Sequence, residues 1–243
     1  MSQIRQSFLT KTFALAAKDL RVEMRGRETL PPMVAFAIAV TLLLAFTIPA
    51  SPTLRTPLTL PTGAVEAADV LAGFMWVTIL FAGLIGFART FEVERQDGAL
   101  DAMLLVPLDR SGLFLAKAIA NFLFVGAVEL FVLPAFVILF SIDIGPGLLT
   151  LLLVVILTNI GFVSVGTLFA ALAAQTRSRE LVLPILALPA LLPIFIASVT
   201  LTSDLLSGIP LNEVAARGWF VILIAYDVIF GTIAALAFEA ALD

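Results

Sequence analysis

Two carboxylates interrupt long apolar stretches of this chain, and their chemistry is the first feature that needs an explanation. Glu129 lies near the middle of one stretch, and Asp227, which follows Tyr226, lies near the middle of another. An ionisable group inside a membrane helix is costly, and such groups commonly line a pathway, relay protons or make buried contacts. Asn159, in a third stretch, is a candidate polar partner. A helix–helix hydrogen bond, worth about 0.6–2 kcal/mol, and a role in a conducting or gating surface are both open interpretations.

The residue types that this chain lacks restrict its chemistry further. It contains no cysteine and no histidine. Disulfides, thiolate metal sites and cysteine nucleophiles are therefore excluded, and the usual general base and the usual zinc and haem ligands are missing. We expect no catalytic residue, no metal site and no directly bound cofactor, which argues against a membrane-embedded enzyme or electron carrier.

The overall composition is that of an integral membrane protein. Of the 243 residues, 61% are hydrophobic and 13% are charged, whereas soluble domains average about 45–50% apolar and about 25% charged residues. The net charge of −4 argues against nucleic-acid binding.

A membrane-spanning helix needs about 20 mostly apolar residues, and six stretches meet this requirement. They are Leu30–Ile48, Val70–Ala88, Leu113–Phe140, Leu148–Ala174, Leu181–Leu201 and Gly218–Phe238. Apolar residues run along the whole of each stretch and do not alternate with polar ones, so helices are predicted rather than the alternating strands of a barrel. The fifth contains Pro184, Pro189 and Pro193, which predict a kink. The fold class predicted is an all-α membrane protein with one transmembrane domain over residues 1–243.

Basic residues predict the orientation of these spans, because cytoplasmic loops are enriched in lysine and arginine. With the N-terminus inside, 12 of the 14 basic residues fall on the cytoplasmic side, and only Arg55 and Arg217 fall outside. Both termini are therefore expected in the cytoplasm. A cleaved signal peptide fits poorly, because the first apolar run begins only at Leu30 and is longer than the usual hydrophobic region of about 7–15 residues.

Residues 4–28, before the first span, have the pattern of a basic amphipathic helix. Leu9, Phe13, Ala17, Leu20 and Met24 form one apolar stripe, and lysines and arginines lie on the other side. This pattern is typical of a helix in the membrane interface. The alternative is a solvated basic tail.

The segment of residues 89–112 is the one sizeable cytoplasmic connection. Its charged start is followed by a short predicted helix, Ala99–Leu105, with Leu100, Met103 and Leu104 on one face and Pro107 after its end. Such a helix can dock into a groove of a soluble partner or rest on the membrane. From the residues alone, both interpretations are open.

Three patterns here resemble the CcmB family, the membrane subunit of the haem-exporter-type ABC transporter of cytochrome c maturation. The loop reads Glu94-Arg95-Gln96-Asp97-Gly98-Ala99-Leu100 and then Leu104-Leu105-Val106-Pro107-Leu108. The N-terminal segment contains Lys18-Asp19-Leu20-Arg21 followed by Glu28, and the fifth span reads LVLPILALPALLPI. The resemblance covers essentially the whole chain and implies ABC-2-type permease architecture in the bacterial inner membrane. Residues 4–28 would then be an elbow helix and 89–112 the coupling loop.

The resemblance also implies partners. The residues expected to contact a separate ATPase, CcmA, are Glu94, Arg95, Asp97, Gly98, Leu100, Met103, Leu104 and Pro107. The chain contains no G-x-x-x-x-G-K-[ST] phosphate loop, so ATP is expected on that partner. The other implied partners are CcmC, CcmD, the haem chaperone CcmE and a second copy of the permease, with haem bound by partner subunits. Two alternatives stay open: a permease that exports a drug or polysaccharide, and a scaffold that transports nothing.

Overall fold

The computed structural model describes residues 8–48, 57–60, 63–91, 110–142, 145–174, 176 and 179–241. Helices account for nearly all of this part of the chain. In order, the elements are α1 (Phe8–Gly26), α2 (Leu30–Thr47), β1 (Pro57–Leu60), β2 (Gly63–Glu66), α3 (Ala67–Arg89), α6 (Arg110–Leu139), a 3₁₀ turn at Gly145–Gly147, α7 (Leu148–Ala174), α8 (Arg179–Leu206), α9 (Leu211–Ala216) and α10 (Trp219–Ala241).

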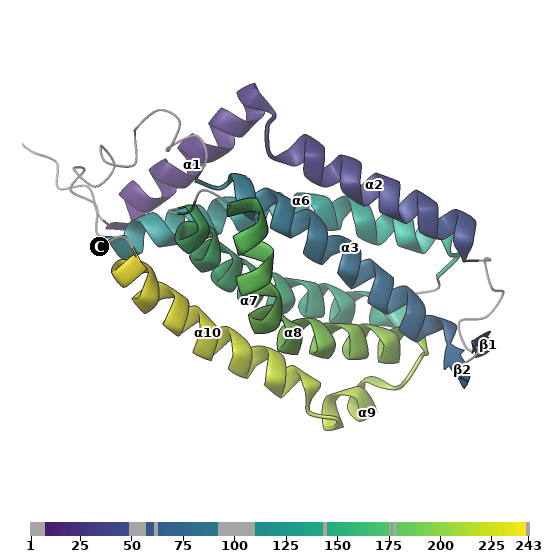
Figure 1. Cartoon of the computed structure of the whole chain (residues 1–243). Coiled ribbons are helices and arrows are strands. Elements are labelled where there is room, and N and C mark those ends of the chain that lie inside the picture. The colour runs from purple at the N-terminus through teal and green to yellow at the C-terminus, as the bar shows by residue number, and fades with distance from the viewer. Residues whose placement is uncertain are drawn as a thin grey trace, which may run out of the picture.

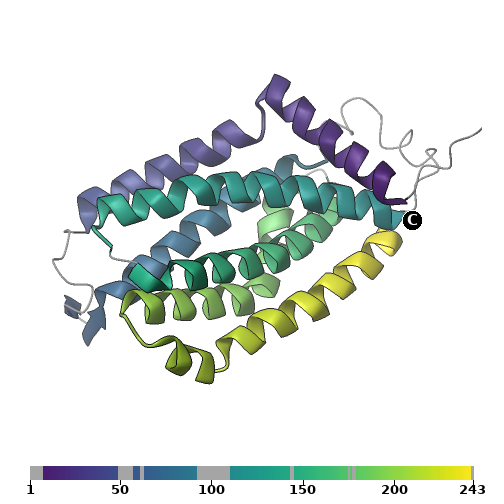
Figure 2. The same ribbon diagram turned by 180° about the vertical axis from the view of Figure 1, so that it is seen from behind.

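The six predicted spans are confirmed. Among the described residues, six helices are long and apolar enough to cross a membrane, and they are α2, α3, α6, α7, α8 and α10. They run up and down between two ends of the bundle (Figure 1). We call one the hairpin end, where β1, β2 and α9 lie. The other is the α1 end, where α1 and the last turn of α10 lie, as the reverse view also shows (Figure 2).

Helices α3 and α7 form the centre of the bundle. Helix α7 contacts α3, α6, α8 and α10, and α3 is the most buried of the six spans. Glycines allow close approach where α3 meets α2 and where α7 meets α3. A Cβ atom added to Gly86, on α3, would lie 2.6 Å from Sδ of Met33, on α2, and one added to Gly166, on α7, would overlap the ring of Phe87, on α3. Helices α2 and α10 lie at the periphery, and few of their residues are buried.

Helix α8 contains the predicted prolines, all three inside the helix. Its first turns run at an angle to the remainder (Figure 1). A proline inside a helix removes one hydrogen bond and bends the axis, so the prediction of a kinked fifth span is confirmed.

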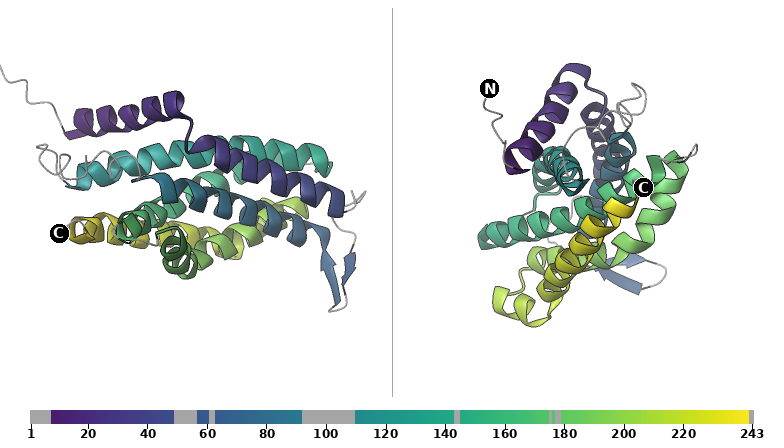
Figure 3. Two further views of the ribbon diagram at one scale, coloured as in Figure 1. Left: turned by 45° about the horizontal axis from the view of Figure 1, so that its top comes forward. Right: turned by 90° about the vertical axis from the view of Figure 1, so that its left-hand side faces the viewer.

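Helix α1 meets α2 at a sharp corner and lies across α6 (Figure 3). The carboxylate of Glu23 fixes this corner: it accepts hydrogen bonds from the backbone N–H groups of Thr29, at 3.0 Å, and Leu30, at 2.8 Å. These donors have no partner within α2, because the first N–H groups of a helix lack an acceptor. The carboxylate also suits the positive end of the helix dipole.

The face of α1 that packs on the bundle combines polar and small or partly buried apolar residues, among them Leu15. Thr12, Ala16 and Glu23 are buried, whereas Phe13 and Met24 of the predicted apolar stripe are 57% and 79% exposed. Phe13, Ala17 and Met24 of the stripe are therefore directed away from the protein, where a membrane interface would cover them, while Leu20 is half-buried.

A two-stranded antiparallel sheet, in which Pro57 pairs with Glu66 and Leu60 with Gly63, lies at the hairpin end. The sequence predicted only a loop here. Helix α9 and the positive-φ residues Gly208 and Gly218 complete this end of the molecule between α8 and α10.

Candidate functional site

The predicted coupling residues Glu94, Arg95, Asp97, Gly98, Leu100, Met103, Leu104 and Pro107 all lie outside the described residues. What the structure does describe is both borders of that segment. Helix α3 ends at Arg89 and α6 begins at Arg110, so the segment connects the end of α3 to the start of α6.

A buried polar network joins these borders. The ammonium of Lys117, on α6, donates a hydrogen bond to the backbone carbonyl of Thr90, the C-cap of α3, at 3.2 Å. The Thr90 hydroxyl donates to Oδ1 of Asn121 at 3.0 Å, and Nδ2 of Asn121 donates to Oγ1 of Thr167 at 2.9 Å. Helices α3, α6 and α7 are thereby linked through side chains that are largely buried.

Glu129 and Asn159 are brought together inside the bundle. Nδ2 of Asn159, on α7, donates to Oε2 of Glu129, on α6, at 3.1 Å and to the carbonyl of Phe122 at 3.3 Å. Glu129 is 4% exposed and Asn159 is 2% exposed. Oε1 of Glu129 and Oδ1 of Asn159 have no hydrogen-bond partner among the described residues, so the pair retains further hydrogen-bonding capacity.

Tyr226 and Asp227 form a separate group on α10. The hydroxyl of Tyr226 donates to the carbonyl of Ala190, on α8, at 2.8 Å, and its ring stacks on Phe230. Asp227 is half-buried and lies against the backbone of α7: a Cβ atom added to Gly161 would lie 2.5 Å from Oδ1 of Asp227.

The four intramembrane polar residues are therefore not one site. Asn159 and Gly161 are two positions apart on α7, and each residue turns a helix by about 100°. One of them consequently faces α6 and the other faces α10. The Glu129–Asn159 pair and the Tyr226–Asp227 pair lie on different sides of the central helix.

A third polar group, at the hairpin end, was not predicted. Nε1 of Trp76 donates to Oγ1 of Thr202 at 2.9 Å, and the hydroxyl of Ser203 donates to Asp69 at 2.5 Å. Arg217 forms an ion pair with Asp204. These contacts join α3, α8 and the turn before α10. The sequence did not predict the contacts between α3 and α8, because the partner residues on α8 follow those on α3 by more than 120 positions.

These features define the class of the protein. Six apolar helices of spanning length, helix α1 across one end and isolated polar pairs within the bundle are the architecture of a multi-pass membrane permease. The sequence model described as "CcmB protein" matches residues 10–243, and the chain belongs to the CcmB family.

Curated relatives agree with this assignment. The chain is 28% identical over 183 residues to heme exporter protein B of Rhodobacter capsulatus, covering 75% of this chain and 78% of the relative. It is 27% identical over 197 residues to heme exporter protein B of Pseudomonas aeruginosa, covering 81% and 82%. The match to heme exporter protein B of Escherichia coli K12 is 29% identical over 109 residues, or 44% of each chain.

Proposed function

We propose that this chain is the membrane permease subunit of an ABC transporter for cytochrome c biogenesis. In this proposal a separate ATPase subunit, CcmA, hydrolyses ATP, and the permease couples hydrolysis to haem handling or to release of the haem-loaded chaperone CcmE. The observation that carries the proposal is the match of the CcmB family over residues 10–243. The relatives' name, heme exporter protein B, supports the assignment of haem as the group handled.

The chain's own residues favour a division of labour. With no phosphate loop, no histidine and no cysteine, it is unsuited to bind ATP in a P-loop or to ligate haem iron through the usual side chains. ATP is accordingly assigned to CcmA, and haem to the other partners, CcmC, CcmD and CcmE. The permease itself is not an enzyme in this proposal.

We assign coupling to the segment of residues 89–112, between α3 and α6. Its apolar residues Leu100, Met103 and Leu104 would enter a cleft of the ATPase. Glu94, Arg95, Asp97 and Gly98 would border that contact, and Pro107 would end the short helix. The polar network of Lys117 and Thr90 supports this role, because it braces both borders of the segment.

The proposal places both termini and this segment in the cytoplasm of a bacterium, with the bundle in the inner membrane. The distribution of basic residues, 12 of 14 on that side, supports this orientation. The exposed apolar stripe of α1 supports an interfacial position for that helix. A second permease copy is also proposed, for which the peripheral faces of α2 and α10 offer apolar area.

Two matched variants test the coupling assignment. Leu104→Asp puts a charge on the proposed docking face, whereas Ala102→Asp puts the same charge on the opposite side of the predicted helix. We expect Leu104→Asp to abolish co-purification of the ATPase from solubilised membranes while the permease is inserted normally, and Ala102→Asp to leave it intact. Equal ATPase recovery with both variants would contradict the assignment of this segment.

A further inference from the structure

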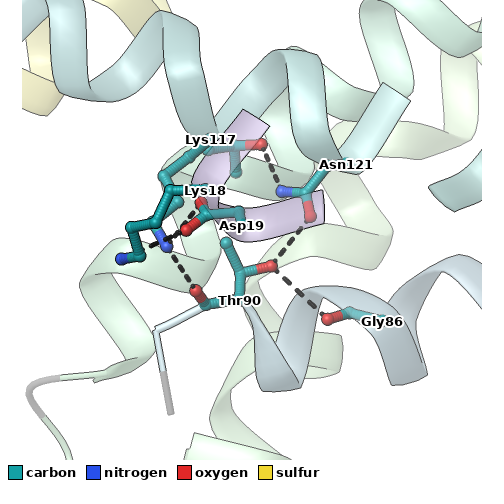
Figure 4. A network of polar contacts seen from close by, with 7 residues as sticks. Lys18, Asp19, Gly86, Thr90, Lys117 and Asn121 are labelled. Atoms are coloured by element: carbon teal, nitrogen blue, oxygen red, sulfur yellow. Dashed lines mark hydrogen bonds and ion pairs between the residues drawn. The ribbon is translucent and has the colours of Figure 1, made fainter. Parts of the chain in front are cut away.

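Lys117 is a buried cation at which three segments distant in the sequence meet. Lys117 is 3% exposed. Nζ lies 2.9 Å from Oδ2 of Asp19, on α1, and 3.2 Å from the carbonyl oxygen of Thr90, at the end of α3. Figure 4 shows both contacts converging on one ammonium group.

Each contact suits a positive charge. The last carbonyls of a helix lack intrahelical donors and carry the negative end of the helix dipole, and Thr90 caps α3. The ring of Phe91 lies beneath the ammonium, 5.5 Å from its centroid, within the range of a cation–π interaction. Asp19, whose side chain is 11% exposed, supplies the balancing carboxylate.

The network has a second cation that provides an internal comparison. Lys18 lies 3.3 Å from Oδ1 of the same Asp19, but its side chain is 44% exposed. A solvent-exposed pair of this kind contributes little. Lys117, in contrast, has exchanged its hydration for contacts with α1 and α3, so its removal leaves Asp19 without its buried partner.

Stability alone is a weak reason for such a group. Replacing a buried ion pair with apolar residues of similar volume is often neutral or stabilising, and apolar residues are abundant here. What the pair does supply is a fixed geometry. Asp19 belongs to α1, whose exposed apolar stripe includes Phe13 and Met24. Thr90 lies at the start of the segment of residues 89–112.

We infer that Lys117 is a positioning residue that holds α1 rigidly against the ends of α3 and α6, so that displacement of these ends is transmitted to α1. The effect of that displacement on transport rests on the proposed function. The effect of Lys117 on the position of α1 does not rest on it, and it can be measured in the isolated chain.

Spin labels test the position of α1 directly, because the natural chain contains no cysteine. One pair joins α1 to α6, with labels at Met24→Cys and Leu123→Cys; a control pair joins α6 to α10, with labels at Leu130→Cys and Ile229→Cys. All four sites are exposed. We expect Lys117→Met to broaden or shift the first distance distribution and to leave the control pair unchanged. An unchanged first distribution would overturn the inference, and so would an equal change in both pairs.

Three single variants extend the test to function in the co-expressed transporter. For Lys117→Met, the yield of cytochrome c per ATP hydrolysed should fall by about 2- to 30-fold, the range over which side-chain networks change coupling between sites. ATPase recovery should stay normal. Lys117→Arg should restore most of the yield, and Lys18→Met should match wild type.

The outcomes separate the two hypotheses. A wild-type chain that recruits no ATPase and supports no cytochrome c maturation would contradict the proposed function, while the spin-label result would still decide the role of Lys117. A functional wild type whose yield per ATP is unchanged in Lys117→Met, or lowered as much in Lys18→Met, would overturn the positioning role alone.

Discussion

Gly161 lies at a close approach between α7 and α10, and Gly161→Ala is the substitution that tests this crossing. The added Cβ would lie 2.5 Å from Oδ1 of Asp227 and 2.9 Å from Cδ1 of Tyr226, and it would overlap Cδ1 of Ile194. Three side chains from α8 and α10 would have to move, and Tyr226 is held by its hydrogen bond to Ala190. We expect the substitution to push α10 away from α7.

The size of the effect follows from two opposing contributions. Inserting a methyl group into a well-packed site costs about 1–3 kcal/mol. Alanine in place of glycine inside a helix contributes at most about 1 kcal/mol in the opposite direction. Because three side chains must move, the cost should lie in the upper half of that range, about 2–3 kcal/mol. The net loss should then be about 1–2 kcal/mol, which for a chain of this size lowers the melting temperature by about 2–8 °C.

Thermal unfolding in detergent, followed by size-exclusion chromatography, measures this change. Gly73→Ala is the matched control, because Gly73 lies inside α3 and a Cβ atom added there meets nothing within 4 Å. It should leave the melting temperature unchanged or raise it slightly.

If Gly161→Ala were as stable as Gly73→Ala, the helices would not approach as closely as the structure indicates. The separation of the Asp227 group from the Glu129 group by α7 would then lose its basis.

Three other predictions concern buried or capping polar groups. Glu129→Leu removes one of the two acceptors of the Asn159 amide and should destabilise the protein by about 1–3 kcal/mol. Glu129→Gln should retain the wild-type melting temperature; equal losses in both variants would indicate that the charge itself is required. Glu23→Ala removes the cap of α2, worth about 0.5–2 kcal/mol, and should speed tryptic cleavage at the α1–α2 corner. The control Glu28→Ala, at an exposed residue, should not change the cleavage rate. Equal rates in the two variants would show that Glu23 does not hold the corner. Trp76→Phe leaves the hydroxyl of Thr202 without its indole donor and should lower stability by about 1 kcal/mol in the same thermal assay; an unchanged melting temperature would contradict that hydrogen bond.

The spans were predictable because the membrane imposes a single requirement, a continuous apolar run of sufficient length. The fourth span was predicted as Leu148–Ala174, and α7 has these bounds. The fifth was predicted to end at Leu201, but α8 continues to Leu206. Its last turn contains Ser203 and Asp204, whose polarity suggested a loop, but Asp69 and Arg217 partner them there.

The periodicity of α1 indicated a helix in the membrane interface, but it did not predict which residues of α1 pack on the bundle. An apolar stripe normally indicates the face that contacts the protein core. In a membrane protein lipid is as apolar as the core, so the stripe can equally face outward. In the structure Asp19 and Glu23 pack on the bundle, because they find partners in Lys117 and the start of α2.

The partners of the buried polar residues could not be predicted from the sequence either. Asn159 was a candidate partner for both carboxylates, and only the packing of α6 on α7 directs it to Glu129. Lys117 was counted simply as a basic residue on the cytoplasmic side. Nothing in the local sequence indicates that it meets Asp19, 98 positions earlier, because that contact depends on how α1 crosses α6.

The central claim is that this chain works as the permease of a cytochrome c maturation transporter. Affinity purification of the tagged chain from gently solubilised membranes of its own organism, with mass spectrometry of the co-purified proteins, tests it most directly. The predicted result is stoichiometric recovery of a separate ATPase subunit together with CcmC, CcmD or the haem chaperone CcmE. Recovery of an ATPase with glycosyltransferases or other export proteins, or of no ATPase at all, would contradict the claim.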